Sequence, residues 1–353
     1  KDDLSLLANM KEKERKKFNS EGIFTVTQLS YTFRPRRRPK RLKNQREKYH
    51  HALKALAIRE QKVHIVGRPD FKIDGTPVYL DVEGLPDRDL YYLIGLRVKT
   101  GDTVVQHSLW SDEAADERAT WNVFLDALAA IEKPFLVHYG SFETAFLRRM
   151  CERYGGPPAD SPAGRAIKSA INLLSVIFAQ IYFPTYSNGL KDLATWLGHK
   201  WSVPNSSGIR SIIWRMGWEA SRDPVAKKSL ITYNSEDCQA LEVLSGFLSR
   251  LCDPGHRAAL ENGTDAAAVL AEESATRSTL WGSFSSKVEG FEAINKAARW
   301  DVQRDKVYIR TDELLRRLSR RREAAEKRAV YVSREVLYER AANCPACGKQ
   351  PPC

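Results

Sequence analysis

Residues 79–84 read YLDVEG and close an apolar run, TPVYLDVEG. Because the side chains of a β-strand alternate between two faces, Asp81 and Glu83 must point the same way. Two like charges close together in a buried strand are unfavourable unless cations neutralise them. Mg²⁺ and Mn²⁺ prefer carboxylate oxygens and bind together with substrate phosphates. The pair therefore predicts a divalent metal site, although an exposed strand edge would show the same pattern.

Two further acidic motifs follow in chain order. In HYGSFETAFL, residues 138–147, Glu143 lies at the start of a predicted helix directly after a predicted strand. In LITYNSEDCQALEVL, residues 230–244, Tyr233 and Asp237 are four residues apart and share one helical face. Each motif alone has a simpler explanation, since an acid favours a helix N-terminus and a tyrosine packs in a core. Together, and in this order, the motifs indicate one catalytic site.

The composition is that of a soluble globular protein of more than one domain. The chain has 353 residues, of which 42% are hydrophobic and 28% charged. No apolar run approaches the roughly 20 residues of a membrane span, and no signal peptide is visible, so we expect a cytoplasmic protein without a membrane partner. The six cysteines are scattered and are expected to be reduced. Both ends of the sequence look like cuts within a longer chain.

The net charge of +12 is unevenly distributed. Residues 1–66 hold 18 Lys and Arg against 7 Asp and Glu, whereas residues 67–250 hold 20 against 22 and the remainder holds 18 against 15. A basic flank beside a slightly acidic centre suits a protein that binds a polyanion at one end and acts on it in the centre.

The basic flank contains two predicted nucleic-acid-binding features. Residues 4–29 predict two short helices around a turn at Gly22, which resembles a helix-hairpin-helix unit, although an ordinary helical pair would show the same spacing. The stretch RPRRRPKR at 34–41 predicts an extended basic strap rather than a helix, or else a solvated linker, and a basic helix follows to about residue 60. The candidate nucleic-acid contacts here are Gly22, Arg34, Arg36, Arg37, Arg38, Lys40 and Arg41.

The centre of the chain alternates predicted strands with helices. Four strands are predicted in KVHIVG, TPVYLDVEG, YYLIGLRVKTG and TVVQHSLW, the first three antiparallel with turns at Gly75 and at 86–89. A helix at 117–131 leads into a strand at 134–140 and a further helix, and helices dominate 170–250. The tryptophans at 196, 201, 214 and 218 are expected in the core rather than in a base-stacking surface.

These motifs resemble the DEDD exonucleases of the ribonuclease H-like superfamily in their tyrosine-bearing form. More narrowly, they resemble the ribonuclease H-like domain of RecB-family predicted nucleases of prokaryotes. The matching segments are YLDVEG with YYLIGL, VHYGSFETAFL, YSNGLKDLATWLG at 186–198, SGIRSII at 207–213 and ITYNSEDCQAL. Two positions depart from the pattern. Glu143 stands where the wider group has Asp, and Asn172 stands where relatives tend to have Asp.

The resemblance implies an α/β fold, with a ribonuclease H-like mixed sheet flanked by helices. It implies a metal-dependent 3′–5′ exonuclease, acting on DNA rather than RNA, in which four carboxylates hold two Mg²⁺ or Mn²⁺ ions. The implied ligands are Asp81, Glu83, Glu143 and Asp237. Tyr233 would orient or help deprotonate the attacking water. His138 and Lys191 are candidate contacts to the substrate phosphates or the scissile strand, although a structural role fits each of them at least as well.

The expected organisation has three regions. Residues 1–66 form a basic, helical nucleic-acid-binding region, residues 67–250 the nuclease domain and residues 251–353 a helical C-terminal region. The last region ends in a CxxC motif at Cys344 and Cys347, which with Cys353 predicts a zinc knuckle lacking its fourth ligand, or else a coincidental pair. By resemblance, a larger multidomain chain or complex is expected.

Two other function classes fit part of the pattern. A non-catalytic or weakly catalytic nucleic-acid-binding subunit of a larger helicase, defence or mobile-element complex could retain the fold, but it has little reason to keep clustered carboxylates beside an anionic ligand. A transposase or integrase shares the fold and an acidic cluster, but the helical Y-x-x-x-D motif favours the exonuclease arrangement.

Overall fold

The computed structural model describes residues 2–33, 49–202, 208–253, 255–256, 260 and 267–271. The chain divides into two compact units, one comprising Lys1–Arg15 and Phe24–Trp281 and the other Lys16–Ile23 and Gly282–Cys353. The basic stretch at 34–41 and the C-terminal cysteines at 344, 347 and 353 lie outside the described residues.

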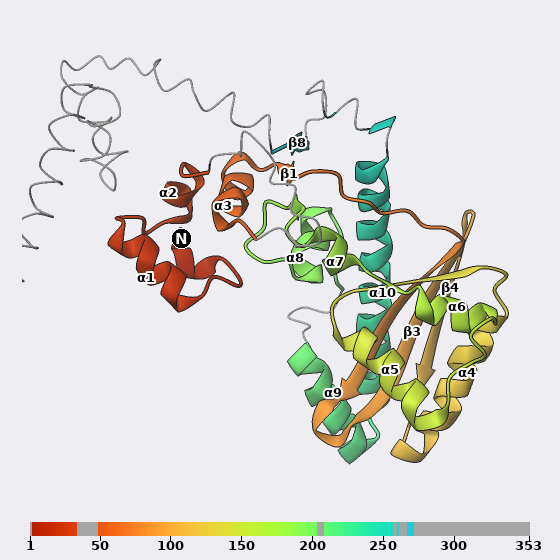
Figure 1. The fold of residues 1–353 in the computed structure, drawn as a ribbon. Helices are drawn as coiled ribbons and strands as arrows, with labels where there is room; N and C mark the ends of the chain where they lie inside the picture. Colours follow the sequence, from red (N-terminus) through yellow and green to blue (C-terminus); the bar gives the residue numbers. More distant parts are fainter. Residues whose placement is uncertain are drawn as a thin grey trace, which may run out of the picture. The chain divides into compact units, whose positions relative to one another are not determined.

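A five-stranded mixed sheet is the centre of the first unit (Figure 1). In spatial order its strands are β4 (Thr103–Trp110), β3 (Leu90–Thr100), β2 (Thr76–Leu85), β5 (Pro134–His138) and β6 (Ile171–Asn172). The first three strands pair antiparallel, and β5 and β6 continue the sheet in parallel. The 3₁₀ turn η2 (Pro86–Arg88) joins β2 to β3, as predicted. The expected mixed sheet flanked by helices is therefore confirmed.

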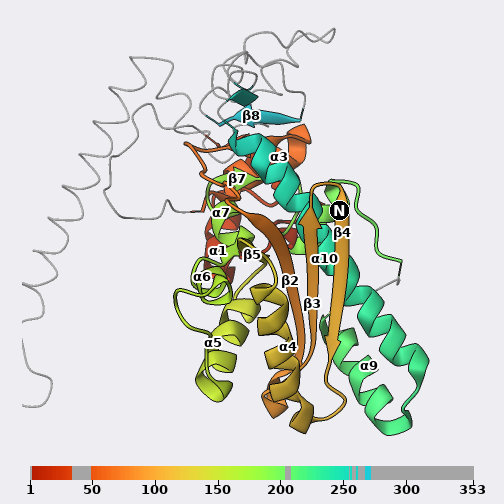
Figure 2. The ribbon, with the colours of Figure 1, turned by 90° about the vertical axis from the view of Figure 1, so that its right-hand side faces the viewer.

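Helices cover both faces of this sheet (Figure 2). Helices α4 (Glu117–Ala129), α5 (Phe142–Tyr154) and α6 (Pro162–Lys168) pack on one face, where Val78, Leu80 and Val82 of β2 enter their common core. The opposite face carries the 29-residue helix α10 (Pro224–Cys252), against which Tyr79 packs, and α9 (Gly208–Ser221). The alternation of β2 therefore sends its even-numbered side chains into one core and directs its odd-numbered ones toward α10 and α9.

The prediction that the strand at 63–65 precedes β2 in the same sheet is wrong. This strand, β1 (Val63–Ile65), is the middle strand of a second sheet, between antiparallel β7 (Ile181–Tyr182) and parallel β8 (Ala268–Leu270). The segment between β1 and β2 has no regular secondary structure, so β1 is not connected to β2 by a hairpin. Both edges of β1 are occupied by partners from distant parts of the sequence, which a reading of consecutive strands does not reveal.

The N-terminal residues form short helices. These are η1 (Leu4–Leu6), α1 (Glu12–Ser20), α2 (Val26–Ser30) and α3 (His51–Glu60). A capping box between Thr25 and Gln28 starts α2, and Gly22 adopts a φ of 78°, which favours glycine. Two helices separated by a glycine turn are thus present at 12–30, while phosphate binding by Gly22 stays a prediction.

The remaining short elements are η3 (Ala114–Asp116), α7 (Leu173–Ile177) and α8 (Leu190–Trp196). Within the part of the chain that the structure describes, no helix combines the length and apolar character needed to cross a membrane.

Gly95 allows α10 to approach the sheet closely. It lies on β3 directly opposite Asp81 of β2. A Cβ atom at this position would lie 2.0 Å from Asn234 Oδ1 and 3.0 Å from Cys238 Sγ, both on α10. Atoms do not approach so closely without displacement, so the distance between α10 and the sheet depends on the missing side chain.

We expect Gly95→Ala to destabilise the protein by about 1–3 kcal/mol, because the added methyl group overpacks the contact between β3 and α10. The matched control is Gly246→Ala in the same helix, where an added Cβ would meet no atom within 4 Å. That change removes a helix-interior glycine and should stabilise by up to about 1 kcal/mol. Urea denaturation measures the free energy of unfolding of both variants. Equal stabilities of Gly95→Ala and Gly246→Ala would contradict the close approach of α10 to β3.

Candidate metal centre

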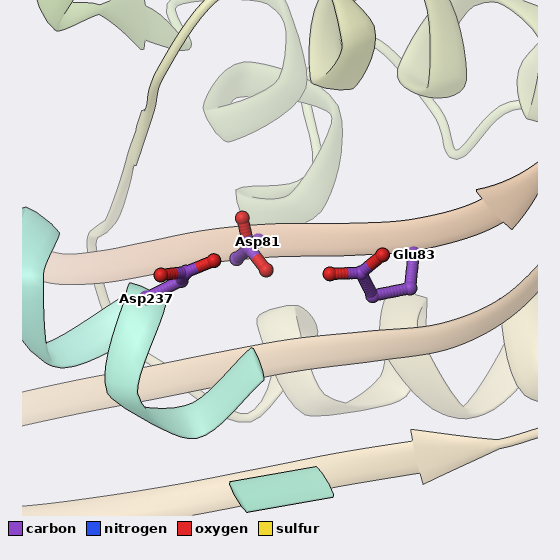
Figure 3. A group of neighbouring side chains, drawn as sticks. All are labelled: Asp81, Glu83 and Asp237. Atoms are coloured by element: carbon purple, nitrogen blue, oxygen red, sulfur yellow. The ribbon is translucent and has the colours of Figure 1, made fainter. Parts of the chain in front are cut away.

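Three carboxylates from two elements meet between β2 and α10. Asp81 and Glu83 extend from the same face of β2, and Asp237 reaches them from α10 (Figure 3). One oxygen from each of the three lies within 4.8 Å of the other two. Glu83 and Asp237 are 8% and 6% exposed, whereas Asp81 is partly exposed. In Figure 3 the carboxylate of Asp81 lies between the other two.

Each of these carboxylates accepts a hydrogen bond from a neutral donor. Asn234 Nδ2 donates to Asp81 Oδ2 at 2.7 Å and to the Asp81 carbonyl at 3.0 Å. Ser211 Oγ of α9 donates to Glu83 Oε2 at 2.6 Å, and Trp201 Nε1 donates to Asp237 Oδ1 at 2.7 Å. These bonds fix the carboxylate orientations without neutralising their charge.

Sequence reasoning missed all three donors, although two of them lie in motifs that it quoted. Asn234 precedes Asp237 by three positions on the same helical face, so its helix position was a usable signal. Ser211 lies in SGIRSII, where nothing in the local pattern links it to Glu83. The expectation that Trp201 belongs to the core is wrong, because its side chain is partly exposed and donates to Asp237. Trp218, at 4% exposure, does belong to the core.

Burial and mutual repulsion make these carboxyl groups bind protons tightly. Desolvation, followed by the charges of Asp237 and Glu83, raises the pKa of Asp81 well above its usual range. Desolvation raises the pKa of Glu83 to about 8, against the opposing hydrogen bond from Ser211. The pKa of Asp237 rises to about 6, again chiefly through desolvation. A divalent cation bound here would neutralise the same carboxylates, in competition with the protons that these raised pKa values favour.

Glu143 lies beside this group but is not one of the three mutually close carboxylates. It is 5% exposed in the first turn of α5, and its charge contributes to the raised pKa values of Asp81 and Glu83. Its Oε2 lies 3.8 Å from Nδ1 of His138, which is 2% exposed at the end of β5. Among the described residues, neither atom has a hydrogen-bond partner. The structure therefore places His138 against Glu143, with a buried carboxylate oxygen still available to a ligand.

Tyr233 and Lys191 complete the surroundings of Asp237. Burial, followed by the charges of Asp237 and Glu83, raises the pKa of Tyr233 above its ordinary value, so its hydroxyl is protonated and hydrogen-bonds to Asp237. Lys191 Nζ of α8 lies 4.5 Å from the centre of the Tyr233 ring and 5.5 Å from that of Trp201. Desolvation lowers the pKa of Lys191, and the neighbouring acids oppose that shift.

Asn172 supports the turn that precedes Glu143. Its Oδ1 accepts from the Gly140 amide at 3.0 Å, and its Nδ2 donates to the Gly140 carbonyl at 2.7 Å. Its Oδ1 also accepts from the Leu174 amide and caps α7. An aspartate could not donate to the Gly140 carbonyl. Asn172, at the position where Asp was expected, therefore bonds both the amide and the carbonyl of Gly140.

These residues suit magnesium or manganese. The donor set consists of carboxylate oxygens, which hard divalent cations prefer, and contains no cysteine sulfur. Glu143 Oε2, which has no hydrogen-bond partner within the described part of the chain, adds a fourth available carboxylate oxygen. Asp81, Glu83 and Asp237, with Glu143 beside them, would therefore hold such ions.

Comparison with known families agrees with this geometry. Residues 78–249 match the family model described as RNase_H superfamily. This part of the chain is similar to that family, and its mixed sheet flanked by helices fits a ribonuclease H-like fold. The matched segment begins in β2 and ends in α10, so it spans all the carboxylates described above. No curated protein and no solved structure matches the chain.

Metal ions should stabilise the protein more at alkaline than at acidic pH. The pKa of Glu83 rises from 4.5 to about 8 and that of Asp237 from 3.8 to about 6 on folding. Groups with raised carboxyl pKa values contribute stability that is lost as pH rises from the unfolded to the folded pKa. Protons occupy these carboxyl groups at about pH 5 and compete with Mg²⁺, whereas the groups are more ionised at about pH 8. Millimolar Mg²⁺ should therefore raise the unfolding temperature more at about pH 8 than at about pH 5.

Asp→Asn variants, in which an amide nitrogen replaces one carboxylate oxygen, test whether the Mg²⁺-induced stabilisation comes from this site. Asp237→Asn should lose most of the Mg²⁺-induced shift, whereas Asp126→Asn, at an exposed position of α4, should keep it. A shift of equal size at both pH values, or one that persists in Asp237→Asn, would show that the ions bind elsewhere.

Proposed function

We propose that the protein is a metal-dependent nuclease of the DEDD type, which removes nucleotides from the 3′ end of DNA. The observation that supports this most is the meeting of Asp81, Glu83 and Asp237 within 4.8 Å inside a ribonuclease H-like domain. The order of the motifs and their resemblance to RecB-family predicted nucleases of prokaryotes favour the exonuclease over other enzymes of this fold.

In this proposal Asp81, Glu83, Glu143 and Asp237 are the ligands of two Mg²⁺ or Mn²⁺ ions. Such ions supply Lewis acidity toward a phosphodiester and lower the pKa of water. The neutral donors Asn234 and Ser211 hold Asp81 and Glu83 in place, so the ligand oxygens need not reorganise when substrate binds.

Tyr233 would orient the attacking water rather than take its proton. Its hydroxyl proton is engaged by Asp237, and the raised pKa of the phenol disfavours the phenolate. The remaining lone pair of the hydroxyl oxygen can accept a hydrogen bond from water. Lys191, whose Nζ lies over the ring of Tyr233, would attract a substrate phosphate.

The decisive experiment compares products from end-labelled linear DNA and from circular DNA in Mg²⁺ or Mn²⁺. The proposal expects mononucleotides from an open 3′ end and no cutting of the circle. Absence of products would favour a nucleic-acid-binding subunit, and strand joining would favour a transposase. An equal rate on RNA would overturn the DNA preference.

Asp81→Asn should lower the rate by at least about a hundredfold, because it removes a ligand charge while keeping the shape of the side chain. Asp126→Asn, exposed on α4, should leave the rate unchanged. Tyr233→Phe should retain part of the activity, since it removes orientation but no ligand. Full activity of Asp81→Asn at unchanged thermal stability would overturn the assignment of the site.

Zinc binding by Cys344, Cys347 and Cys353, and phosphate binding by Gly22 and the basic stretch at 34–41, extend the proposal. A zinc stoichiometry of one per chain in a longer protein would support the first. A weaker salt dependence of DNA binding after charge removal at 34–41 would support the second.

A further inference from the structure

Lys54 is a buried lysine far in sequence from the carboxylates. It lies in α3, and its side chain is among the largest that are fully buried, at 1% exposure. Its Nζ donates to Asn188 Oδ1 at 2.8 Å, Thr185 Oγ1 at 3.1 Å and the Ser187 carbonyl at 3.4 Å. All three acceptors belong to one turn, residues 185–189.

The number of protons on the ammonium group equals the number of acceptors that the turn offers. A lysine ammonium has three protons to donate, and the turn offers three acceptors. Burial lowers the pKa of Lys54 to about 7, against the opposing charge of Asp192. Burying the charged ammonium at this position therefore costs desolvation free energy. An apolar side chain of the same length would avoid that cost but would leave three partly buried acceptors without these bonds.

The same turn is held from a second side and leads directly into α8. The hydroxyl of Tyr139, which follows β5, donates to the Asn188 carbonyl. Ser187 Oγ accepts from the Gly189 amide at 2.9 Å and donates to Asp192 in the first turn of α8. The turn therefore sets where α8 begins and how it is rotated.

The rotation of α8 decides where Lys191 points. Lys191 is the second residue of this seven-residue helix, three positions after Asn188. Its Nζ lies over the ring of Tyr233, and its charge interacts with Asp237, Glu83 and Asp81. A side chain so close to the start of a short helix moves with the turn that precedes it.

We propose that Lys54 is a positioning residue for the metal centre: its buried ammonium fixes the turn 185–189, and the turn holds Lys191 over Tyr233 beside the carboxylates. This inference rests on the proposed function for its catalytic consequence, but not for the placement of Lys191. It assigns to α3, outside the segment that matches the ribonuclease H family, a role in the site.

A double-mutant cycle separates positioning from general support. Lys54→Met keeps the length of the side chain and removes its three donors. If Lys54 acts through Lys191, we expect Lys54→Met and Lys191→Met each to lower kcat/KM for DNA hydrolysis by about tenfold, and the double variant to lose little more than either. Additive losses would overturn the proposal.

Leu128→Ala is the control for destabilisation. Leu128 is fully buried in the core between α4 and the sheet, in a different cluster from Lys54. It should lower the unfolding temperature because it leaves a cavity in the core, yet its effect on kcat/KM should be additive with that of Lys191→Met. Non-additivity of the same size for Leu128→Ala would show that the coupling reflects loss of stability.

Hydrogen exchange provides a readout that does not depend on hydrolysis. Lys54→Met should accelerate exchange of the amides at 185–192, and Leu128→Ala should not do so selectively. If the wild-type protein does not cleave DNA, the proposed function fails, and this measurement still decides the positioning role. Unchanged exchange at 185–192 in Lys54→Met would overturn it.

Discussion

Repulsion among Asp81, Glu83 and Asp237 is the constraint around which the central domain is arranged. Three carboxylates within 4.8 Å on buried elements are an unfavourable starting point for a fold. Their pKa values, raised chiefly by burial and for Asp81 and Glu83 also by the neighbouring acids, express that cost. The cost is tolerable because the remainder of β2 is deeply packed. Val78, Leu80 and Val82 are at most 4% exposed on the opposite face. The sheet thus secures one face by apolar burial and leaves the other to bear charge.

The position of α10 connects that constraint to the rest of the unit. Helix α10 carries Tyr233, Asn234 and Asp237 on the face directed at the sheet, and Leu241, Leu244 and Leu248 below them join the core that also contains Tyr79. The missing side chain of Gly95 brings the helix close enough for Asn234 to reach Asp81. The geometry of the carboxylates therefore depends on the close approach of α10 to β3 at Gly95. Apolar packing further along α10 maintains this approach.

Local sequence patterns predicted the elements but not all of their partners. The alternation in YLDVEG and the i, i+4 spacing of Tyr233 and Asp237 depend on residues near in sequence, so their common faces could be inferred directly. The pairing of β1 with β7 and β8 involves contacts across more than a hundred residues, which no local pattern encodes. Trp201 and Ser211 meet their carboxylates in the same non-local way. Tryptophan and serine also occur in many structural roles, so residue type alone did not predict these contacts with the carboxylates.

The use of neutral donors around the acids follows from what a metal centre requires. A guanidinium in contact with Glu83 would satisfy its charge permanently and compete with any divalent ion. An arginine is in fact nearby: Arg215 follows Ser211 by one turn of α9 and is fully buried. Its guanidinium is directed elsewhere, donating to the carbonyls of Ser111 and Asp112 and to Glu219.

Arg215 also lies 4.6–5.0 Å from the centres of the Tyr92, Trp110 and Trp218 rings. Its charge therefore anchors α9 to the sheet without reaching the carboxylates, and the hydroxyl of Ser211, on the same helix, makes the contact with Glu83. Separating the anchoring cation from the orienting hydroxyl keeps the helix in place while the negative charge of the centre remains available to metal ions.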